Sequence, residues 1–258
     1  MALLAIAVGL LIGLSLGALG GGGSILTVPA LVYLLGQSAH QATTASLLVV
    51  GIAAVAGAIT HARAGRARLR TGAVFGILGI AGSYAGSLAS AAVPANVLLA
   101  GFGVLMLTVA AAMILRSRGR GPSGRGNHPR SGARHVIVVA AAATGVGLVT
   151  GFFGVGGGFV VVPALVLALG FDMPTAAGTS LVVIAVNSAA ALAARAGHGA
   201  FALDWALVAA FTGAAVLGTL AGTRLAGRAN PQRLSAAFTI LVVAVAGYTL
   251  ARSVPGLV

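Results

Sequence analysis

The sequence GLSLGALGGGGSILTVPALVYLLG at residues 13–36 occurs a second time, as GLVTGFFGVGGGFVVVPALVLALG at residues 147–170. The two copies share 13 of 24 residues at a constant offset of 134, and each has a glycine cluster followed by Pro-Ala-Leu. Self-similarity at one fixed offset predicts that the chain consists of two homologous halves.

The chain around these copies is too apolar for a protein that folds in water. Of its 258 residues, 59% are hydrophobic and 7% are charged, with a mean hydropathy of +1.09. A soluble domain needs far more polar surface, so we expect an all-α polytopic membrane protein and exclude a water-soluble enzyme. Apolar stretches occur at residues 2–36, 44–60, 72–92, 97–115, 136–170, 176–194, 205–223 and 235–251.

Two of these stretches, residues 2–36 and 136–170, are too long for one upright helix, because about 17–25 helical residues span a bilayer core. Each has the glycine cluster in its middle. We expect a broken helix there whose second part crosses back or re-enters. The predicted domains are a four-stretch transmembrane repeat at residues 1–115, a cytoplasmic arginine-rich linker at 116–134 and a second four-stretch repeat at 135–258.

The positive charge indicates how the chain crosses the membrane. Ten of the 15 arginines lie in residues 63–70 and 116–134, and arginine-rich short loops are typical of the cytoplasmic side. Because most of this charge lies in short loops beside the membrane and forms no continuous basic face, the net charge of +13 does not indicate a nucleic acid partner, and we expect none. In the second half the arginines are displaced by one loop, to residues 224–233. This displacement favours an inverted repeat, whereas eight simple crossings with parallel halves are the alternative.

Consecutive glycines at membrane depth need a reason, since each costs about 1 kcal/mol of helix stability relative to alanine. A short helix that begins after the glycines directs unpaired N–H groups and its positive dipole end at an anion. The outer glycines, such as Gly13, Gly17, Gly147 and Gly151, suit close helix packing instead. The residues predicted to contact an anion are Gly20, Gly21, Gly22, Gly23 and Ser24 in the first copy and Gly154, Gly156, Gly157 and Gly158 in the second.

Hydroxyl and amide side chains near the two copies are further candidates. Thr44 and Ser46 open the second stretch and Thr179 and Ser180 open the sixth, where they either cap a helix or donate to an anion. Asn187 is an isolated amide in an apolar stretch and should face the protein interior. There it either joins two helices or contacts the substrate.

Groups for catalysis are missing at membrane depth. The chain has no cysteine, and its two acids, Asp172 and Asp204, fall near the ends of stretches. Intramembrane catalysis needs a nucleophile with a base, paired acids or a metal cluster. The five histidines lack metal-ligand spacing, and His40 and His61 are expected to be solvated near loops. We therefore expect no enzymatic activity, no metal and no cofactor.

The repeated pattern G-x3-G-x2-G-x-G-G-x5-P-A-L, followed by small polar residues and Ser-Leu, resembles the sulfite exporter TauE/SafE family of membrane transporters. The resemblance covers nearly the whole chain, although the first copy has Thr44-Ala45-Ser46 where the second has the family's Gly178-Thr179-Ser180. It implies a protein of the bacterial cytoplasmic (inner) membrane that moves sulfite, sulfoacetate or another small organic anion.

These observations together predict a secondary transporter that exports a small anion such as sulfite, sulfoacetate or another organosulfonate. The anion would bind where the two glycine-rich breaks meet near the bilayer centre, and one half would move against the other. The expected partners are the anion and the lipid bilayer, and the oligomeric state is left open. The alternatives are an anion or small-solute channel, which needs a polar lining, and a membrane scaffold or assembly factor.

Overall fold

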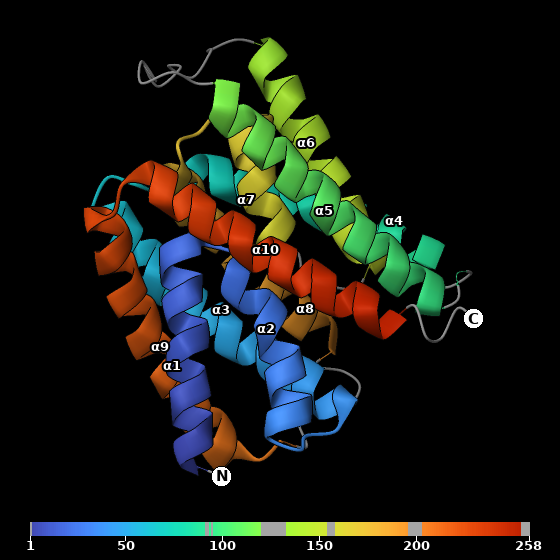
Figure 1. The fold of residues 1–258 in the computed structure, drawn as a ribbon, viewed down its shortest axis with the longest axis vertical. Helices are drawn as coiled ribbons and strands as arrows, with labels where there is room; N and C mark the ends of the chain where they lie inside the picture. Colours follow the sequence, from blue (N-terminus) through green and yellow to red (C-terminus); the bar gives the residue numbers. More distant parts are fainter. Residues whose placement is uncertain are drawn as a thin grey trace.

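The computed structural model describes residues 2–90, 93, 95–119, 133–153, 158–195 and 203–253, and within these ranges the regular structure is entirely helical (Figure 1). The expected all-α class is confirmed. The elements are α1 (Ala2–Leu19), α2 (Gly22–Pro29), the π-helix η1 (Ala30–Leu34), α3 (Ala39–Arg63), α4 (Leu69–Ser90), α5 (Ala95–Gly119), α6 (Ala133–Phe153), α7 (Gly158–Leu167), α8 (Met173–Arg195), α9 (Trp205–Arg228) and α10 (Pro231–Ser253).

The outer surface of these helices is apolar, as a bilayer requires. In the described part of the chain, α3, α4, α8, α9 and α10 each contain a segment long and apolar enough to span a membrane. Ile77, Leu217 and Ile240 are 61%, 63% and 69% exposed. Each such side chain would lose about 1.5–3 kcal/mol of burial energy if it faced water. The chain is therefore an integral membrane protein.

Each glycine-rich stretch forms two helices, as the sequence predicts. The first stretch is divided between Leu19 and Gly22, and α2 runs back along α1, so that Gly23 lies against Ile12 and Leu16 (Figure 1). The second stretch is divided between α6 and α7, with residues 154–157 outside the described ranges. The ten α-helices therefore form two sets of five, α1–α5 and α6–α10.

Pro29 shapes the end of the first short helix. A proline has no N–H to donate and crowds the preceding turn, and the chain after Pro29 widens into the π-helix η1. The Leu35 N–H donates to the Ala30 carbonyl at 3.2 Å, five residues back. The chain therefore stays helical through η1, although the α-helical hydrogen bonding of α2 ends at Pro29.

Two equivalent helices, α3 and α8, cross the centre in opposite directions. A Cβ placed on Gly51 would lie 3.0 Å from Ser188 Cβ, and one placed on Gly57 would lie 2.8 Å from Leu181 Cδ1. The residue numbers in these two contacts rise along α3 and fall along α8, so the two helices are antiparallel. Because α3 and α8 occupy the same place in their repeats, this pairing is consistent with an inverted repeat.

The closest packing between helices joins a helix of one half to a helix of the other. We call each of these glycine-mediated contacts a seam. Gly13 and Gly17 of α1 lie against the backbone of Ala215 and Thr219 in α9, so these helices run parallel. In the equivalent seam, Gly147 and Gly151 of α6 lie against the backbone of α4. Packing is thus confirmed as the reason for all four outer glycines, since small residues let membrane helices approach closely.

The arginine-rich loop of the first half lies beside the arginine-bearing end of a helix in the second half. Arg66, in the loop between α3 and α4, donates from Nη2 to the Thr223 carbonyl near the end of α9 at 3.3 Å. Its guanidinium also lies against Gly227. The loop at residues 64–68 therefore adjoins the end of α9, and Ser90 ends α4 on the opposite side of the bundle.

This arrangement predicts which loops a membrane separates. We expect a cysteine at Ser90 and a cysteine at Arg228 to be labelled by an impermeant thiol reagent from opposite sides of the membrane. The chain has no cysteine of its own, so each single-cysteine variant reports one position. Labelling of both positions from the same side would contradict an inverted repeat.

Candidate anion site at the helix breaks

The first break is a turn that only glycine accommodates. Gly20 has a φ of +80°, and its N–H donates to the Leu16 carbonyl at 2.8 Å, which closes the end of α1. A Cβ at this position would meet the backbone of Ala177 and the Ser180 hydroxyl in α8. Backbone conformation and crowding both require glycine here.

The N-terminal ends of the two short helices meet. Gly21, which precedes α2, lies against the Gly158 carbonyl and Phe159 Cα, and a Cβ on Gly158 would meet the Ser24 hydroxyl. Ser24 and Gly158 are equivalent positions of the two repeats, related by the offset of 134. Equivalent residues that touch one another lie close to the pseudo-twofold axis of the fold. We call this contact of the two N-termini the glycine junction, defined by Gly20, Gly21, Ser24 and Gly158.

The junction combines the chemical features that attract an anion. The first turn of a helix leaves N–H groups without intrahelical partners, and the helix dipole places positive potential there. At the junction two such ends face each other in a low-dielectric surrounding, where electrostatic interactions are stronger. The Ser24 hydroxyl, which lies beside Gly158, donates its one hydrogen to the Gly21 carbonyl at 2.8 Å and would have to rotate to donate to an anion.

The glycines that follow in α2 have other contacts. A Cβ on Gly22 would meet the end of the Leu241 side chain in α10, and one on Gly23 would meet the Ile12 carbonyl and Leu16 in α1. Their missing side chains therefore permit packing, while their N–H groups belong to the first turn of α2. Gly154, Gly156 and Gly157 lie outside the described residues. Anion contact at all five positions stays a prediction.

The predicted hydroxyls lie inside helices, so the capping interpretation is wrong for them. α3 begins at Ala39, with Ser38 as its cap, and α8 begins at Met173. Ser46 and Ser180 donate back to carbonyls of their own helices, those of Thr43 and Ala177, at 2.9 and 2.8 Å. Of these hydroxyls, Ser180 adjoins the junction through Gly20.

Thr44 and Thr179 are both fully buried, but the described contacts do not place them at the junction. Thr179 Oγ1 accepts a hydrogen bond from the Arg68 N–H at 3.1 Å. This bond attaches the α3–α4 loop to α8. The role of Thr179 that the structure supports is therefore to hold that loop.

Asn187 lies on the face of α8 that carries the junction contacts. Ser180, Ile184 and Asn187 are spaced by four and three residues, which places them on one side of a helix. Ser180 contacts Gly20 and Ile184 contacts Gly158. The Asn187 Oδ1 atom is buried without a hydrogen-bond partner, which is costly. Asn187 is half-buried, and its unpartnered atom is an acceptor, so an anion could be contacted only through the amide NH2 group; substrate contact by Asn187 stays a prediction.

Two residues that the sequence interpretation did not assign to the site lie beside it. His61 was expected to be solvated, but its side chain is fully buried and its Nε2 lies 3.1 Å from the Gly17 carbonyl oxygen. It is buried because Gly178 of α8 has no side chain at the point where the ring packs. Arg66 lies in the loop next to it. Nothing in the local sequence around His61 reveals Gly178, which is distant in the chain.

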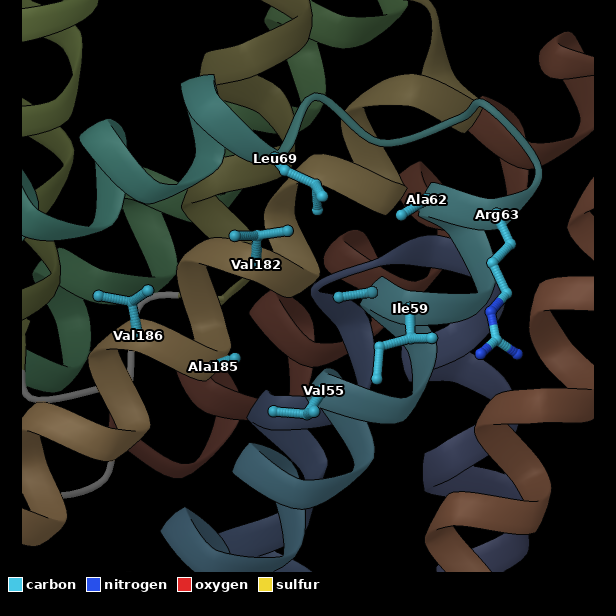
Figure 2. A pocket seen from close by; sticks show the side chains of 9 residues that line it. Val55, Ile59, Ala62, Arg63, Leu69, Val182, Ala185 and Val186 are labelled. Carbon is cyan, nitrogen blue, oxygen red and sulfur yellow. The ribbon is translucent and has the colours of Figure 1, made fainter.

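Two grooves on the described surface lie away from the junction. A groove of about 370 Å3 lies between α3, α8 and the start of α4. Figure 2 shows its lining of apolar side chains such as Val55, Ile59 and Val182, with Arg63 at its edge. A second groove of about 430 Å3 lies between α1, α2 and Tyr248 of α10. Both linings are almost wholly hydrocarbon, which does not suit an anion, and neither includes a junction residue.

The comparisons with known proteins agree with this architecture. The model of the family described as "Sulfite exporter TauE/SafE" matches residues 5–249. A probable membrane transporter protein of Xylella fastidiosa (strain Temecula1) is 35% identical over 253 residues, which cover 96% of this chain and 94% of the relative. The probable membrane transporter protein YunE of Bacillus subtilis (strain 168) is 28% identical over 207 residues, 73% of each chain. No solved structure matches the chain.

Proposed function

The chain belongs to the sulfite exporter TauE/SafE family, and from this premise we propose that it is a secondary transporter that exports a small anion across the bacterial inner membrane. Sulfite, sulfoacetate and other organosulfonates are the anions that we propose as substrates. They carry a compact negative charge and several acceptor oxygens, which match backbone N–H groups at a helix end.

The observation that carries the proposal is the contact between Ser24 and Gly158 at the meeting N-termini of α2 and α7. Discontinuous helices whose positive ends converge near the centre of two repeats are typical of secondary transporters. We propose that the anion binds at this junction and that the Ser24 and Ser180 hydroxyls, rotated away from the carbonyls that accept from them here, and the Asn187 amide NH2 group supply additional hydrogen bonds. In the conformation described here the junction is closed, because the backbones of Gly21 and Gly158 touch.

The seams suggest which parts move. α1 is packed on α9 and α6 on α4 through backbone contacts at glycines, and such contacts resist separation. We therefore propose that the moving bodies are these interleaved pairs, each with its short helix, rather than the two sequence halves. The antiparallel pair α3 and α8 would form the surface along which the bodies rotate. Opening that surface would expose the junction first to one side and then to the other.

Flux measurements in liposomes test the proposed function. We expect sulfite or sulfoacetate uptake into liposomes that contain the purified protein to saturate with concentration. We also expect unlabelled anion on the opposite side to accelerate uptake of the labelled anion, because a carrier returns faster when loaded. Unsaturated flux with an electrical conductance would indicate a channel, and absence of flux for the whole set of anions would contradict the proposal.

A further inference from the structure

A polar cluster lies three residues along α1 from Gly20 of the junction, at the end where α3 meets α8. It consists of His61 at the end of α3, Arg66 in the α3–α4 loop and the small residues Gly17 and Gly178 around them. The Arg66 N–H donates to the His61 carbonyl at 2.8 Å, and both residues contact Gly178. We call these two side chains the inner pair.

The hydrogen bond to Gly17 determines what the His61 ring can offer. A carbonyl oxygen can only accept, so His61 Nε2, which lies 3.1 Å from the Gly17 oxygen, carries the proton. In the neutral ring Nδ1 is then a bare acceptor. That Nδ1 atom is buried without a hydrogen-bond partner, in a side chain that is 0% exposed. The Nδ1 atom of His61 therefore accepts no hydrogen bond from any described group.

Arg66 offers the complementary group. Its Nη2 donates to the Thr223 carbonyl, but its Nε is buried without a partner. The chain has two acids, and neither is placed to neutralise it: Asp172 is exposed, and Asp204 caps the far end of α9. A guanidinium that is partly buried without a counter-ion favours an anion beside it.

His61 and Arg66 reach the packed pair α1 and α9 at successive turns. Gly17, which holds the His61 ring, packs against Thr219, and Arg66 contacts Thr223 and Gly227 of the same helix. Gly17 is also three residues before Gly20 of the junction. The order from the loop inward is therefore Arg66, His61 and then the junction.

We propose that the inner pair is a second anion site, which takes a small oxyanion together with one proton. An oxygen of the anion accepts from Arg66 Nε–H, and the proton lies between another oxygen and His61 Nδ1. An acidic oxyanion such as hydrogen sulfite brings this proton itself, whereas a dianion binds as the proton from solution joins Nδ1. The inference rests on the proposed function and adds proton coupling to it.

The surroundings of His61 make it the titrating member. Among the described residues, α1 contributes Gly17, which accepts from the ring, and α8 contributes Gly178, which packs against it; neither is charged. The charged neighbour is Arg66 of the loop. A change in pH at this site is therefore registered by His61 alone.

The test uses sulfite and sulfoacetate flux and the full-length protein in liposomes. For the wild type, we expect an imposed pH gradient to drive sulfite accumulation. In His61→Gln, the amide nitrogen can replace Nε2 and keep the bond to Gly17, but nothing replaces Nδ1. Because hydrogen sulfite itself carries a proton, the pH response is compared with sulfoacetate, which stays a dianion near neutral pH. We expect the wild type to accumulate sulfoacetate in response to the pH gradient and His61→Gln to transport it without that response.

Arg66 variants keep the test independent of the folding of α3, because Arg66 lies in a loop. Arg66→Gln and Arg66→Lys both remove the Nε–H, and we expect about a tenfold or greater rise in the KM for sulfite in each. Arg63→Gln is the matched control, an exposed arginine three residues earlier, and should behave as the wild type.

The outcomes separate the two proposals. Wild-type KM in both Arg66 variants, or an unchanged response of sulfoacetate flux to the pH gradient in folded His61→Gln, overturns the inner pair and leaves the proposed function standing. Sulfoacetate flux in the wild type without any response to the pH gradient also overturns it. Absence of anion flux in the wild type overturns the proposed function, and with it the inference that rests on it.

Discussion

Replacing Gly158 by serine is expected to reduce both the thermal stability of the protein and its anion flux. The new Cβ would meet the Ser24 hydroxyl and would lie 3.0 Å from Ile184 Cδ1. Overpacking of this kind typically costs about 1–3 kcal/mol, and it would force the N-termini of α2 and α7 apart. We expect a lower unfolding temperature in detergent and at least a tenfold loss of flux per folded molecule.

A second substitution at the equivalent position of the other repeat should rescue the Gly158→Ser variant. Ser24→Gly in the same chain removes the colliding hydroxyl, so that the serine and glycine exchange places between equivalent positions. We expect the double variant to recover most of the stability lost in Gly158→Ser. Wild-type stability in Gly158→Ser alone, or no recovery in the double variant, would show that α2 and α7 do not meet at these residues.

A second large effect is expected at the seam between α6 and α4. Gly147→Ala would push a methyl group into the backbone of Gly79, which cannot move away as a side chain can. We expect loss of most folded protein from the membrane, measured by size-exclusion chromatography of a fluorescent fusion. Gly145→Ala is the matched control: it lies two residues earlier on the same helix, and its Cβ would meet nothing within 4 Å. Equal amounts of folded protein in the two variants would contradict the seam.

The features that the sequence predicted correctly are those encoded by local composition. The glycines at residues 20–23 break a helix because they weaken it wherever they occur, and an apolar stretch of 35 residues cannot remain a single upright helix in a bilayer. Gly13 and Gly17, like Gly147 and Gly151, are small residues at a spacing of four, which identified them as packing residues. These inferences required no knowledge of the partner helix.

The features that the sequence did not reveal depend on contacts between distant segments. Ser180 follows the start of its apolar stretch closely enough to resemble a cap, but α8 begins earlier, at Met173. His61 precedes Arg63 and therefore resembled a loop residue, whereas Gly178 provides the space that buries it. Pairing of α1 with α9, across the two halves, also has no local signal.

Protection of a cysteine at Ser24 tests most directly whether an anion binds at the glycine junction. A thiol at the N-terminus of a helix is readily ionised and alkylated, and Ser15→Cys, on α1 beside the apolar groove, provides the control. The anion whose flux has been established is added at ten times its Kd. We predict that alkylation of Ser24→Cys slows about tenfold, because the rate is proportional to the fraction of sites left unoccupied, while alkylation of Ser15→Cys is unchanged. Equal alkylation rates of Ser24→Cys with and without the anion would contradict binding at the junction.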